Sequence, residues 1–338
     1  MAELKLHLIG SCPVIGSGKS NEYPGLLESV AGWAERDGWE AILIYADNRQ
    51  ADPWLVAQII VEKTSHLRPL VAVQPLYAHP FAVAKSILTI AQVYGRQIYL
   101  NMVAGSFPRD MEALCDTTAH DRRYDRVVEY ATIVRDLFKN SGLLSVTGEF
   151  YRVKNLQLLP KTQPELWPKF LISGSSQAGV NAARKIGARA IRYLRPAGEY
   201  GLDSFDKGLM HGTRLGIVTR ETHEAAWEVA HRRYPEDAYG AGIRRVAASV
   251  SDSVWVKELS LDIRVPAGHP YWLGPYKNYQ TACPFLVGSS KEVIAELAEY
   301  IRLGITTFLI EQPEDREDSA RITEVFEAAR QVAFASRT

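Results

Sequence analysis

The chain has 338 residues, 46% of them hydrophobic, and its 39 basic and 39 acidic side chains give a formal net charge of zero. The apolar fraction is too high for a disordered chain. The balanced charge is untypical of proteins that bind nucleic acid or membrane surfaces through electrostatics. The length is sufficient for one large α/β domain or two smaller ones.

The same sequence indicates a cellular compartment. No segment comes near the roughly 18 consecutive apolar residues of a membrane-spanning helix. Met1 leads into a strand-like run instead of a signal peptide. The three cysteines, Cys12, Cys115 and Cys283, have no metal-binding spacing, and their odd number argues against a disulfide framework. We therefore expect a cytoplasmic protein with reduced thiols.

Short apolar runs alternate along the chain with segments of helical period. Strands are predicted at residues 4–9, 41–45, 69–73, 97–103, 169–172, 190–193, 215–218 and 306–310. Helices are predicted at residues 23–37, 53–64, 78–92, 120–138, from Ser176 to 186, and at 222–233, 291–303 and 318–333. Gly38 is expected to end the first helix in a left-handed conformation, and Asp52 to cap the second before Pro53.

Eight strands separated by helices predict a (β/α)₈ TIM barrel that spans residues 1–338 as one domain. Such a barrel needs about 250 residues, so the surplus must lie in excursions. A hairpin is expected at 142–158. The largest excursion, 234–288, lies between strands seven and eight and has weak periodicity with many aromatic residues, which is typical of a lid. An open doubly wound sheet is the alternative, although the glycine fingerprint of a dinucleotide fold is absent.

One strand leads into a feature that can hold phosphate. Lys169 to Ser176 reads as a strand, a glycine turn and two serines at a helix start, where backbone N–H groups and hydroxyls can bind an anion. The alternative is that Ser175 or Ser176 only caps the helix. His120 and Tyr124 lie on one face at the start of another helix, where a phosphate would also be stabilised.

Two further residues occupy positions that matter in a barrel, because active sites form at the C-terminal ends of its strands. Asn101 ends the fourth strand and can hydrogen-bond a heterocycle, or can simply form a turn. Arg214 opens the seventh strand and can bind an anionic group, or can form an external ion pair. Hydrolase motifs, a Walker A loop and metal-binding patterns are absent from the sequence.

With these residues placed, the chain resembles the bacterial luciferase-like flavin monooxygenases, and most closely their alkanesulfonate monooxygenase group. The resemblance depends on the order and spacing of several strings, which span most of the chain. These strings are Leu43-Ile-Tyr-Ala-Asp-Asn-Arg-Gln-Ala-Asp-Pro-Trp54, Leu70-Val-Ala-Val-Gln-Pro75, Leu100-Asn-Met-Val-Ala-Gly-Ser106, His120-Asp-Arg-Arg-Tyr124, Ile172-Ser-Gly-Ser-Ser176, Arg214-Leu-Gly-Ile-Val-Thr-Arg-Glu-Thr222 and Leu303-Gly-Ile-Thr-Thr-Phe308.

The resemblance implies a two-component monooxygenase that uses reduced FMN and O₂, through a C4a-peroxyflavin, to oxygenate a small polar or acidic organic substrate. An NAD(P)H:flavin reductase would supply the reduced FMN, and the chain would form a homodimer or homotetramer. The resemblance also implies two sets of site residues. Cofactor-binding residues would be Asn101, Ala104, His120, Tyr124, Gly174, Ser175 and Ser176, and catalytic residues would be Arg214, Gln50, Lys277 and Tyr279, the last two in a lid that closes over the site.

The chain also departs from the sulfonate enzymes. Gln50 stands where they have a cysteine, Gly216 where they have a histidine, and Glu311-Gln312-Pro313 where they have a tyrosine. The segment 194–212 is short, so the sixth helix of the barrel is expected to be trimmed. We therefore expect the scaffold and the flavin site to be kept and the substrate to differ.

Two other functions remain open. A deazaflavin (F420)-dependent oxidoreductase on the same fold would need extra basic residues at the mouth, for which Arg192 and Arg195 are candidates. A non-catalytic flavin-binding protein would account for the changed residues. Arg192, Arg195, Arg214 and Lys277 together predict a locally basic mouth within a neutral chain.

Overall fold

Eight parallel strands close into a barrel in the computed structural model, which describes residues 4–15, 21–105, 108–261 and 265–335. Each strand pairs with its neighbours in chain order, and β12 closes the ring between β1 and β9. The barrel strands are β1 (His7–Ser11), β2 (Ala41–Ile44), β3 (Arg68–Val73), β4 (Tyr99–Met102), β7 (Lys169–Ser173), β8 (Arg189–Arg192), β9 (His211–Arg220) and β12 (Ile305–Ile310). The predicted TIM barrel is confirmed.

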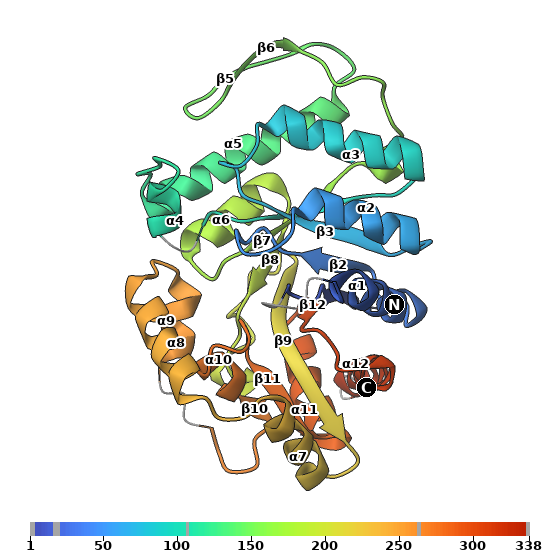
Figure 1. Ribbon diagram of the computed structural model, residues 1–338, viewed down its shortest axis with the longest axis vertical. Helices are drawn as coiled ribbons and strands as arrows, with labels where there is room; N and C mark the ends of the chain where they lie inside the picture. Colours follow the sequence, from blue (N-terminus) through green and yellow to red (C-terminus); the bar gives the residue numbers. More distant parts are fainter. Residues whose placement is uncertain (1–3, 16–20, 106–107, 262–264, 336–338) are drawn as a thin grey trace.

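Helices surround the barrel on its outside (Figure 1). They are α1 (Tyr23–Arg36), α2 (Pro53–Lys63), α3 (Pro80–Tyr94), α4 (Pro108–Glu112), α5 (His120–Lys139), α6 (Gln177–Ile186), α7 (His223–Arg233), α11 (Ser290–Arg302) and α12 (Arg316–Ala335). The terminal helices α1 and α12 lie side by side. Only a short 3-10 turn (Ala197–Glu199) follows β8, so the trimmed sixth helix is also confirmed. No helix in the described ranges is both long and apolar enough to span a membrane.

Local sequence explains where these helices begin and end. The Asp52 carboxylate accepts hydrogen bonds from the backbone N–H groups of Trp54 and Leu55, and Pro53 occupies the first turn of α2. Gly38 follows α1 with a φ of +73°, which glycine adopts without strain. These are the two terminal signals that the sequence predicted.

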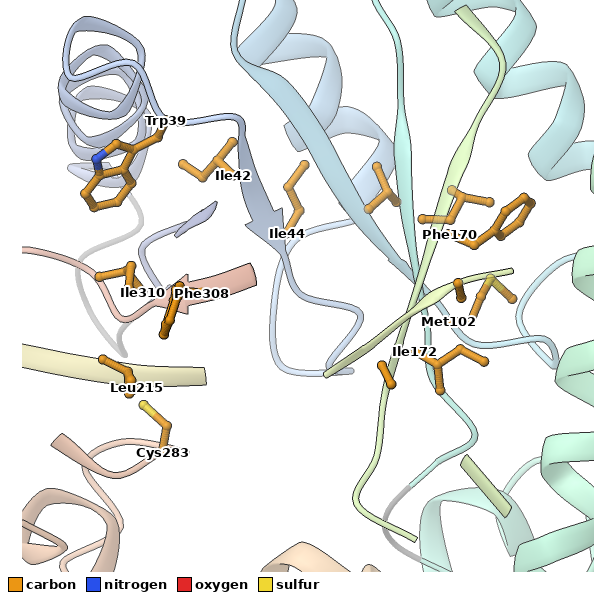
Figure 2. Packing of buried hydrophobic residues seen from close by; sticks show 14 of the residues in the cluster. Trp39, Ile42, Ile44, Met102, Phe170, Ile172, Leu215, Cys283, Phe308 and Ile310 are labelled. Atoms are coloured by element: carbon orange, nitrogen blue, oxygen red, sulfur yellow. The ribbon is translucent and has the colours of Figure 1, made fainter. Parts of the chain in front are cut away.

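The core has two layers because successive strand residues point to opposite sides. Ile9, Leu43 and Leu171 belong to a group of side chains that fills the barrel interior. Their neighbours in sequence, such as Ile42 and Ile172, pack outside the strands against the helices. Figure 2 shows part of this outer layer. The strands buried on both faces therefore appear in the sequence as continuous apolar runs.

The excursion between the seventh and eighth barrel strands, β9 and β12, is confirmed in position. It contains α8 (Ala238–Val250), α9 (Val254–Ser260), β10 (Tyr271–Trp272), α10 (Gly274–Lys277) and β11 (Phe285–Ser289). In Figure 1, α8 and α9 lie next to each other at one side of the barrel. β11 runs parallel to the second half of β9, with Phe285 opposite Gly216. The sequence shows only weak periodicity here, and the structure contains short helices and strands that this periodicity did not locate.

Two other predictions differ in detail from the structure. The hairpin forms as β5 (Leu144–Thr147) and β6 (Arg152–Leu156), which extend beyond α5 in Figure 1. The seventh strand begins earlier than predicted, because the buried polar residues His211 and Arg214 belong to it. Each is tolerated there because it has a hydrogen-bond partner, which an apolar pattern cannot reveal.

Candidate functional site

A cavity of about 260 Å³ opens at the C-terminal ends of the barrel strands. This is the end at which TIM barrels place their active sites. Nearly every barrel strand contributes to its wall. The contributing residues are Leu43 of β2, Ala72 of β3, Asn101 of β4, Ser173 of β7, Tyr193 after β8, Arg214 of β9 and Leu309 of β12.

A larger hollow of about 740 Å³ lies at the opposite end, beside Glu40 and Arg68. There the Glu40 carboxylate contacts the His7 ring at 2.7 Å and accepts hydrogen bonds from Tyr99 and Arg189. These contacts lower the pKa of Glu40 against the opposing effect of its burial. Polar networks at the N-terminal face of a barrel serve stability. We therefore take the smaller cavity as the functional site.

One corner of the cavity lies between the starts of α5 and α6. The His120 and Tyr124 rings both line it and contact each other edge to face, with centroids 5.4 Å apart. Ser176 caps α6 by accepting the Gly179 N–H at 3.2 Å. Burial raises the pKa of Tyr124, and a hydrogen bond with Ser176 partly offsets this effect. The corner therefore combines a phenol, an imidazole and a helix N-terminus.

The serine pair performs the capping role that the sequence left open, although this role is compatible with anion binding. The Ser175 hydroxyl accepts the N–H of Tyr193 at 3.3 Å, and Ser176 is the N-cap. The first backbone N–H groups of an α-helix have no intrahelical acceptor and remain available to a ligand. Gly174 makes room for the Tyr124 hydroxyl, because a Cβ at this position would lie only 2.4 Å from that oxygen.

The floor of the cavity carries an amide. Asn101 is buried at the end of β4, and its Oδ1 accepts a hydrogen bond from the Ser173 hydroxyl at 2.9 Å. This bond uses the carbonyl side of the amide and leaves the Nδ2 donor for a ligand. Ala104 lines the cavity nearby, where its small side chain allows close approach of a flat ring.

A buried ion pair forms the back wall. Arg214 on β9 donates through Nη2 to Glu311 Oε2 at 2.8 Å and to the Tyr45 hydroxyl at 2.8 Å. Burial lowers the pKa of Arg214, but the charge of Glu311 outweighs this effect and raises it. Burial is also the main reason why the pKa values of Tyr45 and Cys283 are raised. Arg214 therefore stays charged next to neutral phenol and thiol groups.

The excursion supplies one wall of the cavity. Trp255 on α9 lines it and stacks on Tyr193, with ring centroids 4.0 Å apart and planes 14° from parallel. The Arg123 guanidinium on α5 pairs with Asp252 just before α9 and donates to the Gly105 carbonyl at 2.9 Å. This contact holds the excursion against the barrel, as a lid requires.

The structure separates the site residues named from the sequence into two groups. Asn101, Ala104, His120, Tyr124 and Arg214 line the cavity, and Gly174, Ser175 and Ser176 lie directly behind Tyr124. Ser106, in the motif that contains Asn101, lies outside the described residues.

The other three residues lie away from the cavity wall. Gln50 accepts the Ile15 N–H at 2.7 Å, and Lys277 is exposed on α10. Tyr279 contacts Arg49, which pairs in turn with Asp47 at the mouth. Their proposed catalytic roles stay predictions, because none of the three is among the described residues that line the cavity.

The predicted basic mouth is not observed. Arg195 pairs with Glu199 at 2.7 Å, and the Arg192 guanidinium lies over the Phe205 ring, so neither lines the cavity. The described lining instead includes two carboxylates, Asp47 and Asp110. Sequence alone gives only residue types, whereas the geometry of the Arg195–Glu199 pair and the place of Arg192 over Phe205 are set by the folded chain.

Sequence reasoning missed several residues of the wall. Tyr45 was read only as a strand end and Tyr193 only as a strand residue. Glu311, which pairs with the wall residue Arg214 but is not among the described lining residues, was read only as a departure from a family pattern. Trp255 was grouped with the aromatic residues of the excursion without a role. The C-terminal ends of the predicted strands were the one available signal, because both tyrosines stand there.

Comparison with known proteins adds an independent line of evidence. A family model described as luciferase-like monooxygenase matches residues 15–307. The chain is also similar to the 4-(gamma-L-glutamylamino)butanoyl-[BtrI acyl-carrier protein] monooxygenase BtrO of Niallia circulans. The two proteins are 29% identical over 321 residues, which cover 91% of this chain and 94% of that protein.

Solved structures share the fold at low sequence identity. A long-chain alkane monooxygenase superposes with a TM-score of 0.74 and 16% identity, covering 97% of this chain and 91% of its own. An F420-dependent secondary alcohol dehydrogenase superposes with a TM-score of 0.67 and 17% identity, covering 96% and 99%. Because proteins of both kinds share this fold, the fold does not choose the cofactor.

Proposed function

Because the chain belongs to the luciferase-like monooxygenase family and is a flavin-dependent monooxygenase, we propose that it is the oxygenating component of a two-component, FMN-dependent system. The observation that carries this proposal is the corner formed by His120, Tyr124 and the N-terminus of α6, which opens into the strand-end cavity. A single phosphate fits this corner, and a flat ring fits the cavity beside it.

The residues present fit FMN. Gly174 lets the Tyr124 hydroxyl approach the backbone at the start of α6, so the phenol and the helix N-terminus lie at the same corner. We propose that His120, Tyr124, Ser175 and Ser176 hold the phosphate, and that Asn101 and Ala104 contact the isoalloxazine ring. Bound reduced FMN would supply the electrons that activate O₂, so that one oxygen atom enters the substrate and the other leaves as water.

The protein itself positions the reactants and excludes water. Asn101 Nδ2 can donate to a ring carbonyl, because Ser173 already occupies the amide oxygen. Trp255 and Tyr193 present flat apolar faces that keep solvent out of the cavity. Tyr45 remains protonated because burial raises its pKa, so its hydroxyl is available as a neutral donor or acceptor. The Arg123–Asp252 contact keeps the excursion closed over these groups.

Substrate and partners complete the proposal. The family relative from Niallia circulans acts on an acyl group carried by a protein. We propose for this chain a small, polar organic substrate, free or carried in the same way. An NAD(P)H:flavin reductase would supply reduced FMN, and the chain would work in the cytoplasm as a homodimer or homotetramer. The cavity, enclosed by the excursion, is suited to a small group.

An anaerobic titration tests the cofactor. We expect reduced FMN to quench the tryptophan fluorescence of the protein, because Trp255 lines the cavity, and reduced F420 to quench it much less. Preferential binding of reduced F420 would instead support an F420-dependent oxidoreductase.

A coupled assay tests the chemistry. With a flavin reductase, NADH, FMN and O₂, a substrate should lower the release of hydrogen peroxide while an oxygenated product appears in the mass spectrum. The panel should include free acids, amides and acyl thioesters. Tight binding of reduced FMN with hydrogen peroxide as the sole product across this panel would favour a non-catalytic flavin-binding protein.

A further inference from the structure

The cation at the back of the cavity already has a counter-ion. Arg214 is only 7% exposed, and its Nη2 lies 2.8 Å from Glu311 Oε2. An arginine in a cavity wall usually recognises a carboxylate, sulfonate or phosphate of the ligand. Here the Glu311 carboxylate, which is not among the described residues of the cavity lining, pairs with Arg214 from behind, so the pair as a whole carries no net charge.

Glu311 is held in this position by the fold. Its backbone N–H donates to the Leu215 carbonyl at 3.0 Å, which fixes the end of β12 beside β9. The Cys283 thiol lies 3.4 Å from Glu311 Oε2 and donates to the same oxygen that Arg214 contacts. The carboxylate is therefore oriented by two barrel strands and by the excursion, and a ligand that displaced it would have to break its contacts with Arg214 and Cys283.

The rest of the wall adds negative charge. Asp47 and Asp110 line the mouth, and Asp47 pairs with Arg49 at 2.8 Å, outside the lining. In the described part of the chain, Arg214 is the only arginine or lysine that lines the cavity. An anionic ligand would therefore meet the Asp110 carboxylate and the Asp47–Arg49 pair at the entrance, and a second neutralised pair at the back.

We propose that Glu311 is a specificity-determining residue, which makes the cavity accept an uncharged polar group, such as an amide, and reject a carboxylate or a sulfonate. This inference rests on the proposed function, because it takes the cavity to be the substrate site. The physical reason is that a second anion beside Glu311 in a water-poor cavity is repelled without any gain from Arg214. An amide lacks this repulsion and still hydrogen-bonds to Arg214 and Tyr45.

Isosteric ligands test the inference on the unmodified protein. The probes are butanamide against butanoate and benzenesulfonamide against benzenesulfonate, with binding to the FMN-loaded protein followed by ligand-observed NMR at neutral pH. We expect each amide to bind at least roughly tenfold more tightly than its anion. Equal or tighter binding of the anions would overturn the inference.

Variants test the role of Glu311 directly. E311Q leaves Arg214 without a counter-ion, so we expect benzenesulfonate to bind at least roughly tenfold more tightly than to wild type and to raise the Tm of the variant. The double variant R214Q/E311Q should show no such gain. The matched control is E314Q, which alters an exposed ion pair with Arg232 and should keep wild-type discrimination.

Failure of the inference on Glu311 and failure of the proposed function would give different results. If E311Q gains no affinity for the sulfonate while it still binds reduced FMN, the inference on Glu311 is wrong and the proposed function stands. If the wild-type protein does not bind reduced FMN at all, the proposed function is wrong. The wild-type probes decide the inference even where E311Q does not fold.

Discussion

Tyr124 lies where α5 faces the start of α6, and its surroundings explain why a phenol is useful there. The side chain is buried, and its hydroxyl borders Gly174 and Ser176. The ring packs against Gly179 of α6, while the hydroxyl lies at the corner that we assign to the FMN phosphate. A phenol therefore joins the core to the site, as tyrosines with one buried and one polar end commonly do.

Replacing Tyr124 with phenylalanine should weaken FMN binding with little change in the fold. A hydrogen bond to a charged group contributes about 1.5–3 kcal/mol, so the Kd for FMN should rise roughly tenfold to a hundredfold. Fluorescence titration measures this. Tyr130→Phe is the control, because Tyr130 lies on the same helix, α5, but its hydroxyl donates to the Ala78 carbonyl before α3. It should lower the unfolding free energy by about 1–3 kcal/mol and leave the Kd unchanged. An unchanged Kd in Tyr124→Phe would contradict the phosphate assignment.

Residue types and the positions of strand ends predicted much of this site, but they did not predict which side chains contact one another there. Asn101 and Tyr124 were found because they stand near the ends of elements, and Arg214 because it is a basic side chain in a predicted barrel strand, although β9 begins three residues before it. The neutralisation of Arg214 by Glu311 was not, because the two residues lie 97 positions apart and meet only when β9 and β12 pair. The net charge at the site therefore depends on which side chains the fold brings together, and counting basic and acidic residues in the sequence cannot predict it.

At the scale of elements, Asp116 fixes the segment that leads into α5. Its two carboxylate oxygens accept hydrogen bonds from Arg126 at 3.0 and 2.7 Å, and one also accepts the Thr118 hydroxyl. The Arg126 guanidinium, followed by these Thr118 contacts, lowers the pKa of Asp116 to about 2. This contact positions the start of α5 and therefore the His120 and Tyr124 side chains.

Replacing Asp116 with asparagine should destabilise the protein in a pH-dependent way. The folded-state pKa lies below the unfolded value of about 3.9, so the stabilisation is complete above that value and is lost as the pH falls toward about 2. At pH 7 we expect a loss of about 2 kcal/mol in urea unfolding, and the difference from wild type should shrink below about pH 4. Asp125→Asn, which alters an exposed pair with Arg122, should cost under about 0.5 kcal/mol. A difference that persists unchanged at low pH would contradict this role.

Some elements were predictable and others were not, for identifiable reasons. The helix α2 has its cap, its proline and its apolar face in the sequence. The helix α8 contains Gly240 and Gly242, which lower its helix propensity. Tertiary contacts compensate, since the Arg244 side chain donates to the Tyr276 and Thr281 carbonyls at 2.8 Å each. Such contacts within the excursion leave no periodic signal.

At the scale of the whole molecule, β9 connects the barrel to the excursion. Its first half pairs with β8 and β12 and closes the barrel, while its second half pairs with β11. Gly216 lies at the change between the two, and the Phe285 ring of β11 occupies the space where its side chain would be. A histidine, which the sulfonate enzymes have at this position, would have no room beside Phe285. Packing therefore explains why this chain has Gly216 there.

Replacing Gly216 with alanine should detach this part of the excursion. The new Cβ would lie 2.2 Å from the Phe285 ring, so either the ring or the strand must move. Overpacking of this kind costs about 1–3 kcal/mol. We expect a lower Tm and faster hydrogen exchange in β11, α9 and α10. Substrate turnover should fall more than FMN binding does, because the corner assigned to the phosphate lies between the starts of α5 and α6 and not at β11.

The matched control is Gly242→Ala in α8, where a Cβ meets no atom within 4 Å. This change should stabilise the helix by about 0.5–1 kcal/mol, since alanine is the better helix former. If Gly216→Ala is as stable as wild type, the ring of Phe285 moves freely, and β9 does not hold the excursion in place. If instead FMN binding and turnover fall together, the excursion contributes to the flavin site itself, and the division between a barrel that binds flavin and an excursion that encloses substrate is wrong.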